Sequence, residues 1–133
     1  MSAVRFDHVS KAFGEKKVLD DVSFEIEPGQ AFCLLGRSGT GKSVSLRHII
    51  GLMQPDSGHV FVEDKDVAAL DRRELAEVRK HMGVLFQNAA LFDSMTVGDN
   101  VSFPMRRHTD WSAAEIHDRA AAKLADVGLA ANF

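Results

Sequence analysis

The sequence predicts an α/β fold in which a phosphate-binding loop lies between a strand and a helix. Short apolar runs alternate along the chain with segments of helical periodicity, which is typical of this fold class. A glycine-rich stretch, residues 36–43, separates one apolar run from one helical segment, so that a helix N-terminus follows the loop. Because the apolar runs are few, we expect only a partial parallel core sheet and a truncated domain.

Two strands with alternating apolar and polar side chains are expected at the N-terminus. They cover residues 4–13 and 18–26, and the polar turn 14–17 joins them. A turn of this length between two consecutive strands predicts an antiparallel hairpin ahead of the loop.

Three further apolar runs predict strands. Residues 30–35 and 83–86 are apolar on both faces, as expected of buried parallel strands, and residues 60–62 form a shorter run. Cys33 is the only cysteine and lies in the first run, so we expect a small buried side chain there and no disulfide or metal site.

Residues 36–43 match the pattern G-x-x-x-x-G-K-[ST] at every fixed position. Glycines let the backbone turn tightly around a polyphosphate and point several N–H groups at it. Lys42 supplies positive charge for the β- and γ-phosphates, and the hydroxyl of Ser43 is suited to Mg²⁺. The motif therefore predicts a nucleotide site made of Gly36, Arg37, Ser38, Gly39, Thr40, Gly41, Lys42 and Ser43.

Helices are expected at residues 44–53 and after two segments with the residue order of a capping box, 71–74 and 112–115. Gly128 is expected to end the last helix. The apolar residues predicted to face the core from these helices are Leu46, Ile49, Ile50, Met53, Leu75, Val78, Met82, Ile116, Ala120, Leu124 and Val127.

The composition is that of an ordinary globular protein. The chain has 133 residues, of which 45% are hydrophobic and 26% charged, and its net charge of −3 argues against a nucleic-acid partner. The N-terminus lacks the layout of a signal peptide, and no window is long and apolar enough to span a membrane, so we expect a cytoplasmic protein. The histidines show no mutual spacing of metal ligands.

Taken with these motifs, the whole chain resembles the ATP-binding subunits of ABC transporters. Several independent segments carry the resemblance in order along the chain. They are residues 9–14, 19–24, 28–29, 36–43, 51–52, 55–58, Gln87 and 96–101. The resemblance implies an N-terminal portion, residues 1–133, of a single ATP-binding domain, with an antiparallel β part (1–30), a P-loop core (31–87) and the start of a helical subdomain (88–133).

The resemblance also implies roles for single residues. Phe13 would stack on the adenine of ATP with Val18 packed beside it, and Val44 would add a backbone N–H to the phosphate loop. Gln87 would reach Mg²⁺ with Ser43 and sense the γ-phosphate, acting with Lys42 in catalysis. Residues 88–105 would face a transmembrane permease, and a second ATP-binding subunit would complete a homodimer on the inner face of the cell membrane.

Three segments, residues 85–87, 90–93 and 100–106, resemble the Mce/Mla-type lipid-transport ATPases in particular. That similarity implies transport of phospholipid or a related lipid. The chain departs from the family at Val44, where many members have a hydroxyl, and at Asp64, where many have a turn glycine. Asp tolerates a left-handed conformation, so we expect that turn to be kept.

The family's signature motif, the strand that ends in Asp-Glu and the switch histidine are missing from these 133 residues. We therefore expect ATP hydrolysis from a full-length protein and not from this chain alone. Two alternatives remain at this point, a non-transport ABC ATPase of cell division or translation and a small P-loop kinase. The Gln87 segment and the N-terminal hairpin do not belong to the plan of such a kinase.

Overall fold

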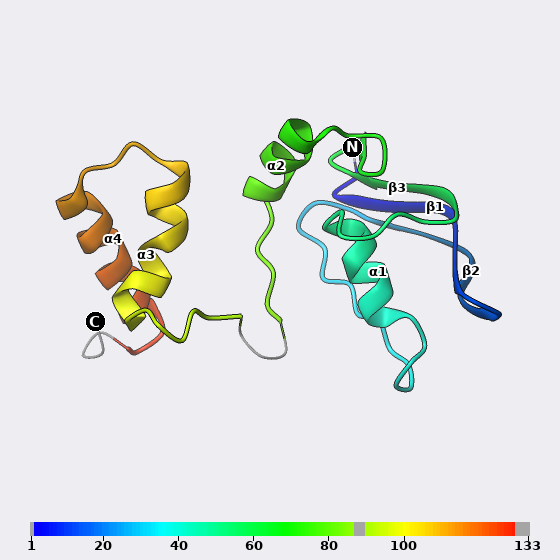
Figure 1. Ribbon diagram of the computed structural model, residues 1–133, viewed down its shortest axis with the longest axis horizontal. Helices are drawn as coiled ribbons and strands as arrows, with labels where there is room; N and C mark the ends of the chain where they lie inside the picture. The colour runs from blue at the N-terminus through cyan, green and yellow to red at the C-terminus, as the bar shows by residue number, and fades with distance from the viewer. Residues whose placement is uncertain (1, 87–89, 130–133) are drawn as a thin grey trace. The chain divides into compact units, whose positions relative to one another are not determined.

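The computed structural model describes residues 2–86 and 90–129 (Figure 1). Within these limits the chain forms two compact units, residues 1–83 and 84–133. The first unit is a sheet covered by helices, and the second is a pair of helices. Each unit is described by itself.

The first unit contains a four-stranded antiparallel sheet in the order β2-β1-β3-β4. The predicted N-terminal hairpin is confirmed as β1 (Val4–Phe13) and β2 (Lys16–Ile26). The predicted strand at residues 60–62 is confirmed within β3 (Ser57–Val62), which pairs with β1, and β4 (Lys65–Asp66) lies at the edge.

The turn between β3 and β4 consists of Glu63 and Asp64, both with positive φ, 49° and 60°. Left-handed residues at both central positions match the right-handed twist of a hairpin. The carboxylate of Asp64 also accepts hydrogen bonds from the backbone N–H and the hydroxyl of Ser2, each at 3.3 Å. Asp64 therefore keeps the turn without glycine, as the sequence predicts.

Helix α1 (Lys42–Ile49) lies against this sheet and completes the first core. The buried side chains of that core come from three strands, and the helix adds Val44 and Ile49. The buried side chains of this core are Phe6, Val9, Leu19 and Val60. Helix α2 (Arg72–Lys80) covers a second cluster, formed by Val62, Val67 and its own Val78.

The predicted capping box of α2 is confirmed in full. The Asp71 carboxylate accepts from the backbone N–H groups of Arg73 and Glu74, at 2.7 and 2.8 Å, and the Glu74 carboxylate accepts from Asp71 N–H at 2.9 Å. From the other end of α2, the Arg79 guanidinium donates to the carbonyls of Ile50 and Gly51, at 2.9 and 3.2 Å. This cation neutralises the negative end of α1 and ties the two helices together.

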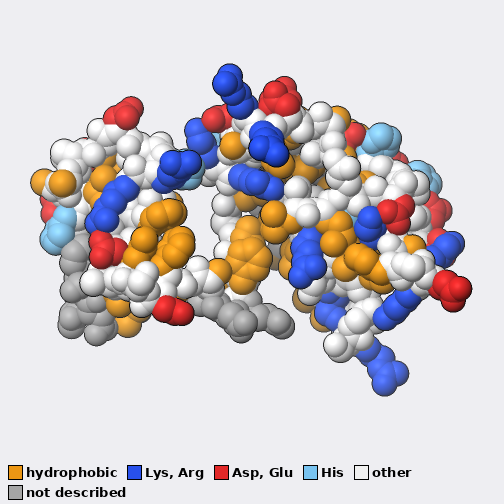
Figure 2. All heavy atoms as spheres, in the orientation of Figure 1, with side chains coloured by type: hydrophobic (Ala, Val, Ile, Leu, Met, Phe, Trp, Pro, Cys, Tyr) orange, Lys and Arg blue, Asp and Glu red, His pale blue; other side chains and the backbone are white. Residues whose placement is uncertain are grey.

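The two predicted parallel strands are wrong for the described part of the chain. Residues 30–35 and 83–86 form no strand, and most of their apolar side chains are exposed, Leu35 by 88% and Leu85 by 89%. Figure 2 shows that hydrophobic side chains lie at the surface of the molecule among charged ones. Cys33, expected to be buried, is exposed as well. A parallel strand needs a neighbour that runs in the same direction, and all strand pairs among the described residues are antiparallel.

Phe32 connects the first of these segments to the sheet. Its ring stacks on Phe24 at a centroid distance of 4.9 Å, and Phe24 stacks on Phe6 at 4.4 Å. The column of three rings holds the backbone that leads into the glycine-rich loop close to the core.

Helix α1 starts two residues before the predicted span 44–53 and ends at Ile49, four residues early. Gly51, at φ +69°, stops it: Gly51 N–H donates to His48 O at 3.0 Å and Leu52 N–H to Arg47 O at 2.8 Å. The predicted core face is wrong at Leu46, which is exposed, because Ser45 and His48 occupy the buried side instead.

The second unit contains α3 (Val97–His108) and α4 (Ala113–Asp126), which lie side by side as a helical hairpin (Figure 1). Half of the predicted capping box of α4 is found: the Ser112 hydroxyl accepts from Glu115 N–H at 3.2 Å, while the Glu115 carboxylate accepts from Arg119 at 3.2 Å. The predicted core residues Ile116, Ala120 and Leu124 are buried, but Val127 is exposed because the helix ends before it. Gly128, at φ +76°, ends α4 as predicted.

Candidate nucleotide site

The start of α1 is arranged to receive an anion. Gly41 is the N-cap with φ 94°, and the first intrahelical bond runs from Ser45 N–H to Gly41 O at 2.8 Å. The backbone N–H groups of Lys42, Ser43 and Val44 therefore have no partner within the helix. No side chain caps this end and its first turn holds no acidic residue, so nothing in the helix competes with an anionic ligand.

Lys42 lies over the glycine-rich loop. Its ammonium donates to the carbonyls of Gly36 and Arg37, at 2.7 and 2.8 Å. The hydroxyl of Thr40 donates to the same Arg37 carbonyl at 2.8 Å and closes the loop. Neutral carbonyls thus hold the Lys42 ammonium, the group that the sequence predicts to bind phosphate, at the loop. A phosphate oxygen can take the place of these carbonyls and form a charge-assisted hydrogen bond with the ammonium.

Two glycines are required by the space around them. A Cβ at Gly36 would lie 2.6 Å from the Thr40 hydroxyl. A Cβ at Gly41 would lie 2.8 Å from a methyl of Leu19 and 2.9 Å from the carbonyl of Val18. The N-terminal hairpin therefore lies directly against the helix end of the loop, and Val18, which the sequence links to the nucleotide, is brought to it.

Lys16 is a cation near the loop that the sequence analysis did not single out. Its ammonium lies 3.8 Å from the position that a Cβ at Gly39 would take. Its place in the hairpin could have indicated this, because the pairing of β1 with β2 sets Lys16 opposite Phe13. A cation at that position adds to the positive charge that Lys42 supplies.

Ser43 and Val44 differ in environment. Ser43 is exposed at the first turn of α1, and its hydroxyl makes no hydrogen bond within the described ranges. Val44 packs its side chain against the first core, which accounts for an apolar residue where the family has a hydroxyl. The described part of the chain has no cluster of three or more His, Cys, Asp or Glu that could hold a metal.

Phe13 ends β1 with its side chain 48% exposed, which leaves the ring available for stacking. The ammonium of Lys11 lies 5.8 Å from the ring centroid. Gln87, the expected γ-phosphate sensor, falls outside the described residues, as do Asn88 and Ala89.

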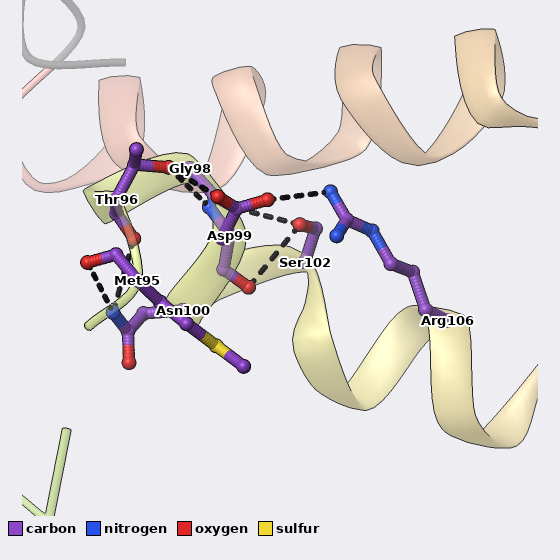
Figure 3. Close-up of polar contacts among 7 residues, drawn as sticks. All are labelled: Met95, Thr96, Gly98, Asp99, Asn100, Ser102 and Arg106. Carbon is purple, nitrogen blue, oxygen red and sulfur yellow. Dashed lines mark hydrogen bonds and ion pairs between the residues drawn. The ribbon is translucent and has the colours of Figure 1, made fainter. Parts of the chain in front are cut away.

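A network of polar contacts fixes the turn that enters α3 (Figure 3). The Thr96 hydroxyl donates to the Asp99 carboxylate at 2.7 Å, and Arg106 donates to the same carboxylate at 2.9 Å. These two contacts hold the pKa of Asp99 below its usual range, the Thr96 bond being the larger cause. Asn100 donates to the carbonyls of Met95 and Thr96 and so closes the turn.

The described part of the segment 88–105 leaves many apolar side chains exposed. They are Leu91, Phe92, Met95, Val97 and Phe103, while Val101 and Met105 are half-buried. Next to them, between α3 and α4, lies a groove of about 680 Å³ that Asp99, Arg106 and Trp111 help to line. The second unit thus offers an open surface with both apolar and charged side chains. None of the described helices is both long and apolar enough to traverse a membrane.

Comparisons with known proteins agree on one family. The family described as ABC transporter matches residues 19–132. The chain is 42% identical over 127 residues to "Probable ribonucleotide transport ATP-binding protein mkl" of Mycobacterium tuberculosis, covering 96% of this chain and 35% of the relative. It is 40% identical over 126 residues to "Methionine import ATP-binding protein MetN" of Clostridioides difficile, covering 95% and 39%.

A further relative is "Intermembrane phospholipid transport system ATP-binding protein MlaF" of Escherichia coli, 39% identical over 121 residues, with 91% of this chain and 45% of the relative covered. Among solved structures, the dimeric ATP-binding cassette MJ0796 bound to ADP and Pi matches with a TM-score of 0.80 at 30% identity. The match covers 92% of this chain and 57% of that one. The chain thus spans 35–45% of the length of these three sequence relatives. The predicted fold class, that of an ATP-binding cassette, is confirmed for the part of such a cassette that the chain covers.

Proposed function

The chain belongs to the ABC transporter family, and we propose that it binds Mg-ATP at residues 36–43 as part of a transporter's ATP-binding subunit. In this proposal the loop and the N–H groups that open α1 hold the phosphates, Lys42 neutralises them, and Ser43 ligates Mg²⁺. Phe13 and Val18 receive the adenine. Gln87 completes the metal site and senses the γ-phosphate.

One observation carries the proposal. The start of α1 has free backbone donors, no acidic side chain, and the Lys42 ammonium held over the loop at 2.7 Å from Gly36 O. A triphosphate carries several negative charges, and each of these features stabilises negative charge at the same place. The relatives share the description ATP-binding, which is consistent with this ligand.

Substituting Lys42→Ala should weaken ATP binding roughly 10- to 150-fold, because a charge-assisted hydrogen bond contributes about 1.5–3 kcal/mol. The measurement is a titration of a fluorescent ATP analogue with Mg²⁺ present.

Lys80→Ala is the matched control, since it removes one surface lysine of α2 whose ammonium contacts Glu77 at 2.7 Å. It should bind the analogue like the unchanged protein. Equal affinity of the Lys42→Ala variant and the unchanged protein would refute the assignment of the loop.

In the full-length protein, we propose, ATP binding and hydrolysis drive a transmembrane permease, with a second ATP-binding subunit completing a homodimer on the inner face of the cell membrane. The segment 88–105 is the contact to the permease. Its exposed apolar side chains, Leu91, Phe92 and Phe103 among them, are what a docking helix can cover. A site that directly follows Gln87 can favour one docked state when ATP is bound.

The transported molecule in this proposal is phospholipid or a related lipid. The similarity of residues 85–87, 90–93 and 100–106 to the Mce/Mla-type ATPases supports it, and the phospholipid-transport relative MlaF is consistent with it. The ribonucleotide- and methionine-transport relatives are as similar in identity, so the assay must separate the three classes. ATP-dependent removal of labelled phospholipid from vesicles by the reconstituted transporter, with no response to methionine or ribonucleotide, is the expected result.

Substituting Leu91→Asp in the full-length protein should break the complex with the permease, because a carboxylate cannot be buried under an apolar helix without a partner. Leu91 is 65% exposed and Val127 is 68% exposed, so Val127→Asp is a control of matched exposure. Co-purification with the permease and ATP binding are measured for both variants. A Leu91→Asp protein that still co-purifies with the permease would exclude this segment as the contact.

A further inference from the structure

Asp56 lies beside the strand that carries Phe13. The paired register of β1 and β3 ends at Ser10 and Ser57, so the last residues of β1 pair with β2 on one side and have no partner in β3 on the other. Asp56, one residue before β3, bonds to them instead. Its backbone N–H donates to Ser10 O at 2.9 Å, and its carboxylate accepts from Ala12 N–H at 2.7 Å.

The same carboxylate also holds Lys11, at 2.6 Å from the ammonium. The Lys11 side chain is only 17% exposed, and its ammonium is within cation–π distance of Phe13, 5.8 Å from the ring centroid. Asp56 therefore contacts three consecutive residues of β1 and, through Lys11, the face of the ring that follows them.

The charges in this group are complementary. The hydrogen bond from Lys11, followed by the one from Ala12 N–H, holds the pKa of Asp56 below its usual range. The carboxylate is thus ionised at neutral pH, and its charge offsets that of Lys11. Without it, an uncompensated ammonium would lie beside the ring, and residue 12, next to Phe13, would lose one of its backbone hydrogen bonds.

We propose that Asp56 is a positioning residue for the base platform: by holding residues 10–12 and the Lys11 ammonium, it sets the orientation of the Phe13 ring and so the affinity for the base of the nucleotide. This inference rests on the proposed function, in which Phe13 stacks on adenine. Asp56 has no described contact with the loop 36–43, and the phosphate part of the site is independent of it.

The experiment compares ATP with inorganic tripolyphosphate, which has the phosphates and no base. Affinities of the intact protein for both ligands with Mg²⁺ are measured by calorimetry for the unchanged protein, Asp56→Asn and Phe13→Ala. Asp56→Asn should lose roughly 2- to 12-fold in affinity for ATP, the range that an aromatic contact contributes, with no change for tripolyphosphate. Phe13→Ala should lose affinity for ATP at least as strongly and should likewise keep tripolyphosphate.

Asp66→Asn is the control. The Asp66 carboxylate also accepts from one side chain, His59 at 2.7 Å, and one backbone N–H, Ala68 at 3.1 Å, but it lies at the opposite edge of the sheet from β2. It should leave both affinities unchanged. A second variant, Lys11→Met, keeps the Ala12 bond of Asp56 and removes only the cation, and it should show the same ATP-specific loss to a smaller extent.

The outcomes distinguish a failure of the proposed function from a failure of the positioning role of Asp56. An unchanged protein that binds neither ligand would refute the proposed function itself. If the unchanged protein prefers ATP and Phe13→Ala removes that preference, but Asp56→Asn and Lys11→Met retain it, the positioning role is refuted. An equal loss for both ligands in Asp56→Asn would likewise refute it, since that is what general destabilisation produces.

Discussion

His8 and Asp21 form an ion pair at an irregular point of the hairpin. Both residues have positive φ, 51° and 53°, and both lie where the register between β1 and β2 shifts. The imidazole Nδ1 is 2.7 Å from the Asp21 carboxylate. That hydrogen bond, with the charge of Asp21, raises the pKa of His8 above its ordinary value of 6.5.

The raised pKa of His8 determines how the stability of the fold depends on pH. A pKa raised in the folded state means that the pair stabilises the fold fully below pH 6.5 and loses the contribution as pH rises through the raised pKa. We expect NMR titration to place the His8 pKa above 6.5, and Asp21→Asn to return it toward that value. The difference in free energy of unfolding between the two proteins should shrink at alkaline pH; a constant difference would show that the pair is not responsible.

Two helices end in the same way, and the glycine in each has a different setting. Gly51 stops α1 and Gly128 stops α4, both with left-handed φ, 69° and 76°. A Cβ at Gly51 would lie 2.7 Å from a methyl of Leu75 and 3.0 Å from a methyl of Val67, whereas a Cβ at Gly128 would meet nothing within 4 Å. The end of α1 is therefore fixed by packing as well as by backbone conformation.

Gly51→Ala should lower the free energy of unfolding by about 2–4 kcal/mol, the sum of the left-handed strain and the overpacking against Leu75. Chemical denaturation of the two proteins is the measurement. Gly29→Ala is the control, because Gly29 has φ +79° with open space around its Cβ position, and it should cost only about 1 kcal/mol. Equal losses in both variants would mean that the contact with Leu75 relaxes at no cost.

The features that the sequence predicted correctly are the local ones. The capping residues Asp71 and Ser112 act within three residues of themselves, so their role is encoded next to them in the chain. The apolar runs that contain Phe32 and Leu85 also met the local criteria for strands. A parallel strand additionally needs neighbours distant in sequence, and the described chain supplies none for these runs.

The residues of the candidate site also fall into a local group, which the sequence predicts, and a group that only the fold brings together. Its glycines, Lys42 and Ser43 form a contiguous motif that fixes their spacing, and the structure brings them to the start of α1. Lys16 and Asp56 come close to Phe13 only through the pairing of β1 with β2 and β3, so their place beside it depends on contacts that the local sequence does not specify.

The chain taken alone should bind ATP and release phosphate at no more than a trace rate. Phosphoryl transfer to water requires a group that orients the water and groups that stabilise the developing charge. The family's glutamate and signature motif, which supply them, are missing from these 133 residues. Phosphate release from ATP is measured on a preparation for which a separate titration with the fluorescent ATP analogue has shown saturable binding. Turnover like that of an intact ATP-binding cassette would overturn this expectation.

The close approach of Gly41 to Val18 and Leu19 links both halves of the proposed nucleotide site to the N-terminal hairpin. The ring of Phe13 belongs to β1, and the end of the loop at Gly41 lies against β2. In the proposed site the hairpin would therefore set the distance between base and triphosphate. If the proposed site is right, ATP acts there as a bivalent ligand: with its phosphates bound, the base would face its platform at a high effective concentration and lose little further entropy. Adenosine and tripolyphosphate added as separate molecules gain no such advantage, and their combined binding should be far weaker than that of ATP.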